Sequence, residues 1–166
     1  KVLGIACDMS KKEAITVFCK TVHSEWDKVD VLVNNAGLFL PGNLLDAKEG
    51  DLEQLLQTNL LSAYYISRNL LSDIKRSRKG HIFNISSVAG LEAYPNGGLY
   101  AVSKFALTGF SKSLREELKE DKIRVTTVYP GATLTDSWKG VDIPPDRFMA
   151  PEDIADAIVA CYSLSV

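Results

Sequence analysis

Hydrophobic residues along this chain alternate between short continuous runs and longer stretches with helical spacing. The continuous runs predict strands over residues 2–8, 29–35, 81–86 and 123–129. Between the runs, apolar positions recur every three or four residues, which is the period of an amphipathic helix. This spacing predicts helices over residues 12–26, 52–75, 99–119 and 151–162.

The predicted strands are apolar almost throughout, not at every second position. Strands of that kind usually lie in a parallel sheet that is covered on both faces. Their alternation with helices predicts an α/β fold, a Rossmann-type doubly wound parallel sheet in three layers, α/β/α. We expect one domain over residues 1–166, with residues 137–150 as its main irregular segment because Gly140, Pro144 and Pro145 interrupt regular structure there.

Composition narrows the functional classes. The 166 residues are 46% hydrophobic and 24% charged, with a net charge of -2. Such a chain lacks the basic face that nucleic-acid binding needs, so we expect no nucleic-acid partner. No apolar stretch approaches the roughly 20 residues of a membrane span, and no secretory signal opens the sequence. We therefore expect no membrane partner.

The cysteines point to a reducing compartment. Cys7, Cys19 and Cys161 are odd in number and widely spaced, which predicts free thiols in the cytoplasm and no disulfide framework. They do not combine with His23 or His81 at metal-ligand spacing, so we expect no metal site.

Polar and small residues follow each predicted strand. Asp8 follows the first strand, the sequence Asn-Asn-Ala-Gly at 34–37 the second, Ser87 the third, and Pro130-Gly131 the fourth. Ligands of open α/β sheets bind at the carboxyl ends of the strands. These residues are therefore candidates for one shared site.

Tyr100 and Lys104 form the strongest local signal. Residues four apart share one face of a helix, so the phenol and the ammonium can approach the same ligand. A phenol with a pKa near ~10 is a poor acid or base at neutral pH, but a nearby cation lowers that pKa. Alone, the pair also fits a helix with a buried tyrosine and a solvated lysine.

Ser87 and Asn59 are weaker signals. Ser87 ends a predicted strand thirteen residues before Tyr100, where its hydroxyl could hold a substrate oxygen or simply cap a turn. The adjacent Ser86 should point the opposite way, because side chains alternate along an extended segment. Asn59 lies inside an apolar helix, so it is either a satisfied core amide or a support for a water that relays protons.

Together these residues resemble the short-chain dehydrogenase/reductase family over nearly the whole chain. The resemblance rests on Asp8, the Asn-Asn-Ala-Gly motif, Asn59, Ser87, Tyr100, Lys104, Pro130-Gly131 and Thr135, whose order and spacing agree with the family pattern. Each motif is weak alone, whereas the set is specific. The resemblance implies an oxidoreductase that moves a hydride between a nicotinamide cofactor and a carbonyl or alcohol group.

The resemblance also implies a role for each position. Tyr100 would be the catalytic acid/base, and Lys104 would lower its pKa and bind the nicotinamide ribose. Ser87 would orient the substrate carbonyl, and Asn59 would support a water relay to Lys104. The implied cofactor contacts are Asp8 at the adenine, Asn35, Ala36 and Gly37 on the adenosine side, and Pro130, Gly131, Thr133 and Thr135 at the nicotinamide end.

The family pattern opens with a strand, a glycine-rich turn, a helix and a second strand, and none of these precedes Lys1. We expect the domain to be incomplete at this end, with the first β-α-β unit missing, and also short of a final strand. The residue that separates NAD from NADP follows the second strand in this fold. The cofactor is therefore expected to be NADP or NAD, with a slight preference for NADP.

The substrate would be a small carbonyl or alcohol compound. Phe39, Leu91, Tyr94 and Trp138, with Leu40, flank the candidate catalytic groups and favour a moderately hydrophobic substrate. Ordinary loop packing explains each of them equally well. The helices over 52–75 and 99–119 are apolar over much of their circumference, and the resemblance implies that they pair in a homodimer or homotetramer.

Two other functions remain open. One is a catalytically silent regulatory protein that binds NAD(P) on the same fold, since a fold does not fix a function. The other is an epimerase or dehydratase of the extended branch of the superfamily, which the short tail after Thr135 disfavours.

Overall fold

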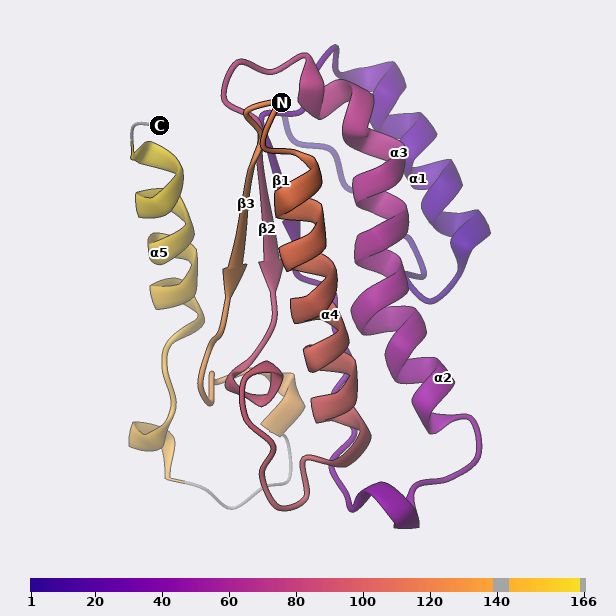
Figure 1. Cartoon of the computed structure of the whole chain (residues 1–166), viewed down its shortest axis with the longest axis vertical. Coiled ribbons are helices and arrows are strands. Elements are labelled where there is room, and N and C mark those ends of the chain that lie inside the picture. Colours follow the sequence, from indigo (N-terminus) through magenta and orange to yellow (C-terminus); the bar gives the residue numbers. More distant parts are fainter. Residues whose placement is uncertain (139–143, 165–166) are drawn as a thin grey trace.

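The computed structural model describes residues 1–138 and 144–164 of the chain. Figure 1 shows its strands β1 (Val31–Asn34), β2 (His81–Ile85) and β3 (Arg124–Val128). Its longer helices are α1 (Lys12–Glu25), α2 (Asp51–Leu56), α3 (Ser62–Lys75), α4 (Gly98–Glu117) and α5 (Pro151–Ser163). Short helical segments are η1 (Leu44–Asp46), η2 (Gln57–Leu61), η3 (Val88–Gly90), η4 (Asp136–Trp138) and η5 (Pro145–Arg147).

The three described strands form one parallel sheet in the order β1-β2-β3. Helices α1, α3 and α4 lie on one side of the sheet and α5 lies on the other (Figure 1). Parallel strands joined by helical crossovers with helices on both faces confirm the predicted α/β fold. All three strands end at the same edge, which is where ligands bind in such folds.

The predicted strand over residues 2–8 is wrong, because the structure has no regular element there. A strand exists only where its backbone pairs with a neighbouring strand. Within the described residues, β1 pairs with β2 alone, and no strand lies beside this segment. Val2 and Leu3 are exposed, and of this segment only Cys7 packs at the edge of the core.

The predicted helix over residues 52–75 is interrupted. Helix α2 passes through the π-helical segment η2 into α3, and Asn59 lies within η2. Single π-turns inside α-helices are frequent at functional sites, because they redirect side chains and free backbone groups. The sequence pattern predicted the helical stretch correctly and missed the interruption.

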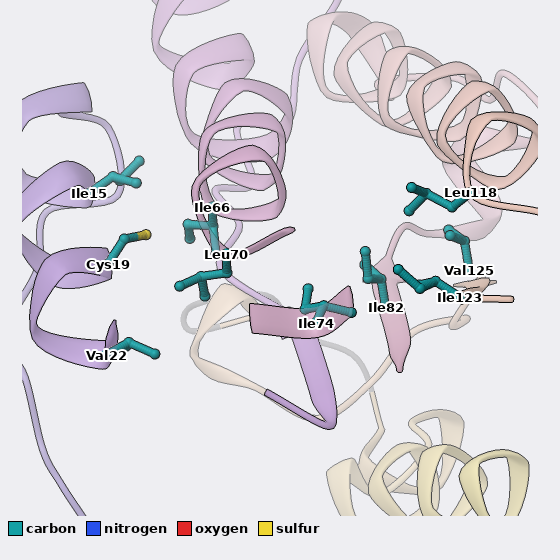
Figure 2. Close-up of a cluster of buried hydrophobic side chains, with 10 residues drawn as sticks. All are labelled: Ile15, Cys19, Val22, Ile66, Leu70, Ile74, Ile82, Leu118, Ile123 and Val125. Atoms are coloured by element: carbon teal, nitrogen blue, oxygen red, sulfur yellow. The ribbon is translucent and has the colours of Figure 1, made fainter. Parts of the chain in front are cut away.

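The hydrophobic core lies between α1, α3 and the sheet (Figure 2). Its buried side chains are Ile15, Cys19, Val22, Ile66, Leu70, Ile74, Ile82, Leu118, Ile123 and Val125. Helix α1 contributes the first three of these side chains and faces α3, whose residues at intervals of four reach the sheet. The core therefore fixes the helices at the end of the sheet that lies away from the candidate site.

A buried polar cluster lies between the strands and the helices. Asn34 donates from Nδ2 to Asn84 Oδ1 over 2.8 Å and to Ser67 Oγ over 3.1 Å. Asn84 in turn donates to Ser111 Oγ over 2.9 Å. Buried amides need such partners, so this cluster connects β1 and β2 to α3 and α4.

The cysteines are free; Cys19 is buried, and Cys7 and Cys161 are partly exposed. Over residues 1–138 and 144–164, none of the helices combines the length and the apolar character that crossing a membrane requires.

Candidate active site

The carboxyl ends of all three strands open onto one cavity of about 380 Å³. Beyond the last paired residues of the sheet, Ser86 N donates to Val128 O over 2.8 Å and Val88 N donates to Pro130 O over 3.1 Å. These bonds bring the segments after β2 and β3 together at the cavity. Predicted site residues that line it are Asn35, Gly37, Phe39, Ser87, Tyr94, Tyr100, Lys104, Pro130, Gly131, Thr133 and Thr135.

Tyr100 and Lys104 lie one turn apart on α4, as their spacing predicted. The Lys104 ammonium is 5.6 Å from the centroid of the Tyr100 ring and donates to Ile85 O at the end of β2 over 2.9 Å. Phe39 packs against the Tyr100 ring in a T-shaped arrangement, with 4.8 Å between the ring centroids. Tyr100 therefore contacts both the loop after β1 and the lysine.

Burial shifts the pKa of each group in the direction that favours its neutral form. It raises the pKa of the Tyr100 phenol, an effect that the Ser87 hydrogen bond opposes and the nearby Tyr94 adds to. It lowers the pKa of Lys104 to about 8. The pKa of the phenol rises overall because its removal from water disfavours the phenolate more than the Ser87 hydrogen bond stabilises it.

Ser87 and Ser86 serve different sides of the strand end. Ser87 accepts a hydrogen bond from Ala89 N over 3.2 Å, caps η3 and reaches Tyr100. Ser86 is buried against α4, with its hydroxyl 3.3 Å from both Lys104 O and Thr108 Oγ1. The two hydroxyls therefore point as the alternation predicted, and the cap holds Ser87 in place.

Asn59 is the best-anchored polar side chain near the cavity. Its Oδ1 accepts from Leu38 N over 2.7 Å, and its Nδ2 donates to Leu38 O over 3.0 Å and to Ser103 Oγ over 2.8 Å. Both protons of the amide are used, so the side chain has none left for a water. These three hydrogen bonds fit an amide that fixes the cavity wall at Leu38 and the helix at Ser103.

Two predicted cofactor residues are not among those that line the cavity. Ala36 is absent from its lining, and Asp8 is exposed, with a carboxylate that accepts from both the backbone and the hydroxyl of Ser10. These contacts lower the pKa of Asp8. The structure brings the remaining predicted cofactor residues together at the cavity.

The substrate candidates divide in the same way. Phe39 and Tyr94 line the cavity, whereas Leu91 is 53% exposed and outside it. Leu40 lines a smaller neighbouring hollow. Trp138 ends η4, and its side chain lies outside what the structure describes.

Leu38 and Ser103 were missed by the sequence reasoning. Leu38 was overlooked because it contacts Asn59 through backbone atoms, which carry no residue signal. Ser103 gave one available signal, a polar residue on the inward side of an apolar helix, since it is fully buried. Such residues need a partner, and the partner here is 44 positions away.

A sequence profile described as short chain dehydrogenase matches residues 1–144. This chain belongs to the short-chain dehydrogenase family. The sepiapterin reductase of Chlorobaculum tepidum is 33% identical over 159 residues, a match that spans 95% of this chain and 65% of the relative. The chain therefore spans about two thirds of the length of that relative.

Solved structures of short-chain dehydrogenases give the same result. A metagenomic short-chain oxidoreductase in complex with NADP is 34% identical, with a TM-score of 0.78 over 97% of this chain and 67% of the other. The L-sorbose reductase of Gluconobacter frateurii, complexed with NADPH and L-sorbose, is 27% identical, with a TM-score of 0.87 over 96% and 69%. Among the described residues of this chain, no three His, Cys, Asp or Glu side chains gather as metal ligands would.

Proposed function

We propose that the protein is an NAD(P)-dependent oxidoreductase that acts on small carbonyl or alcohol compounds. The observation that carries this proposal is the meeting of Ser87, Tyr100 and Lys104 at one cavity, supplied by β2 and α4. The chemistry requires a proton donor, a carbonyl-binding hydroxyl and a cation close together, and these three side chains provide them. Membership of the short-chain dehydrogenase family adds support.

The cavity residues fit the nicotinamide end of a dinucleotide. A Cβ at Gly37 would begin 3.6 Å from Lys104 Nζ, so glycine leaves the ammonium accessible to ribose hydroxyls. Thr133 and Thr135 add hydroxyls across the cavity. The relatives of known structure are bound to NADP and NADPH, which favours NADP over NAD. Asp8 and Ala36 are proposed for the adenosine part, outside this cavity.

In the proposed reaction the nicotinamide supplies or accepts the hydride. During carbonyl reduction Ser87 donates a hydrogen bond to the substrate oxygen and Tyr100 donates its proton to that oxygen, so that an alcohol forms. The raised pKa of Tyr100 keeps the phenol protonated before the reaction. Lys104 then stabilises the phenolate that remains, because a cation beside it lowers the free energy of the charged form. Asn59 holds the wall at Leu38.

The test is a titration of the full-length protein with NADH and NADPH, followed by a panel of ketones. Tyr100→Phe removes the transferable proton and should lower kcat by roughly a thousandfold while cofactor affinity changes little. Lys104→Ala should lower both kcat and the affinity for the cofactor. Substantial turnover by Tyr100→Phe would remove Tyr100 from the mechanism.

The silent regulatory alternative makes a different prediction in the same experiment. A sensor would bind one cofactor tightly and reduce no ketone, and Tyr100→Phe would change nothing. All four candidate catalytic positions hold chemically competent residues, and this favours the enzyme.

We further propose that the protein forms a homodimer through α3 and α4. The outward face of α4 carries the exposed side chains of Val102 and Phe105, and Tyr64 on α3 is exposed beside Phe110, with 6.2 Å between the ring centroids. Apolar stripes on two adjacent helices fit a second copy of the same pair.

A further inference from the structure

Ser103 is a buried serine on α4 that the proposed chemistry does not use. It lies between Tyr100 and Lys104 in the sequence and is fully buried. Its hydroxyl donates to Tyr100 O over 2.7 Å and accepts from Asn59 Nδ2 over 2.8 Å. Ser103 therefore joins the backbone of the catalytic turn to the amide of Asn59.

The Asn59 side chain also binds the cavity wall. Its other two hydrogen bonds both go to Leu38, which lines the cavity. The neighbouring Gly37 also lies close to both groups, since a Cβ there would be in van der Waals contact with Asn59 Oδ1 at 3.5 Å and with Lys104 Nζ at 3.6 Å. The chain of contacts from Ser103 to Leu38 thus sets the separation between the catalytic turn and the wall.

We propose that Ser103 is a positioning residue, which holds Tyr100 and Lys104 at their distance from the loop after β1 by acting through Asn59. The inference rests on the proposed oxidoreductase function. Positions of reacting groups affect rates strongly, because a small displacement removes the aligned geometry that the reaction needs. Ser103 itself is not among the residues that line the cavity.

Ser111 is a matched control on the same helix. It is buried, donates to Leu107 O over 2.7 Å and accepts from Asn84 Nδ2 over 2.9 Å. Both serines therefore bond one asparagine amide and one carbonyl of their own helix. They differ in what the asparagine does, since Asn84 binds within the polar cluster and not to the cavity wall.

The experiment compares wild type, Ser103→Ala, Ser111→Ala and Ser103→Thr in the full-length protein. Each alanine variant loses one bond to a helix carbonyl and one from an asparagine amide, so both should melt at lower temperature. Ser103→Ala alone should lower kcat by about tenfold and move the midpoint of the pH–kcat profile, with cofactor Kd within about twofold of wild type. Ser103→Thr keeps the hydroxyl and should restore kcat and the profile.

Equal kcat and equal pH profiles for Ser103→Ala and Ser111→Ala would overturn the positioning role and leave the proposed function intact. A wild-type protein that neither binds a nicotinamide cofactor nor reduces any ketone would instead overturn the proposed function, and the inference with it. If Ser103→Ala does not fold, Ser103→Cys fills the site with a weaker donor and acceptor and takes its place in the comparison.

Discussion

Lys104 is held where its positive charge is disfavoured, and this has a measurable consequence. In the folded protein burial lowers its pKa to about 8, whereas in the unfolded chain it is about 10.4. Between these pH values the unfolded chain binds the additional proton, so stability rises with pH across this window. The destabilisation is complete below about pH 8 and amounts to roughly 3 kcal/mol.

Lys104→Met should therefore be more stable than wild type at pH 7, and the difference should disappear toward pH 10.5. Urea unfolding of both proteins at intervals between these pH values measures the difference in their free energies of unfolding. The other titrating groups are common to both proteins, so their contributions cancel in this difference. Parallel curves for the two proteins would show that the hydrogen bond to Ile85 O compensates the charge fully.

Among single residues, the sequence predicted those site residues whose neighbours follow from local helix geometry. Tyr100 and Lys104 were found because a helix places residues four apart on one face. Ser103, in contrast, depends on Asn59, which is 44 positions away, and Leu38 takes part through its backbone. The burial that raises the pKa of Tyr100 is also a property of the packed molecule, which no local pattern reveals.

Arg124 attaches α5 to the sheet. Its guanidinium donates to Cys161 O, Tyr162 O and Leu164 O over 3.2, 3.0 and 3.2 Å and lies 5.6 Å from the Tyr162 ring centroid. A cation at the carboxyl end of a helix satisfies free carbonyls and complements the helix dipole. Since α5 buries none of its described residues, these contacts are its main attachment.

Arg124→Gln should leave the strands intact and loosen the last turn of α5. Losing charge-assisted bonds worth about 1.5–3 kcal/mol corresponds to amide exchange faster by roughly tenfold to a hundredfold in that turn. Hydrogen exchange with mass spectrometry measures it. Arg115→Gln, at an exposed position on α4, is the control and should change nothing. Unchanged exchange in Arg124→Gln would mean that other contacts hold the helix.

Elements were predicted from sequence wherever periodicity alone decides them. Helices α1, α4 and α5 and the three paired strands fall close to the predicted ranges. Residues 2–8 were mispredicted because a strand needs a neighbour, which no local pattern reveals. The π-helical segment η2 was missed because local periodicity does not reveal it. It contains Asn59, whose side chain bonds Leu38 and Ser103, both distant along the chain.

For the whole molecule, the exposed apolar face of α3 and α4 predicts how two copies meet. Phe105 is 45% exposed on that face although it is large and hydrophobic. In a twofold symmetric dimer each substitution enters the interface twice. An unpaired charge costing about 2 kcal/mol at each site would then raise the dissociation constant roughly a thousandfold.

If the full-length protein pairs as proposed, Phe105→Glu should make it monomeric at micromolar concentration, as light scattering after size exclusion would measure. Val17→Glu introduces the same charge at a 63% exposed position on α1 and should leave the dimer intact. A monomeric wild type would refute pairing through these helices. Tyr100 and Lys104 lie on the same helix as Phe105. A monomeric Phe105→Glu variant that keeps its turnover would therefore also show that contacts within one chain hold these two residues in place. The bonds of Ser103 with Tyr100 O and Asn59 are contacts of that kind.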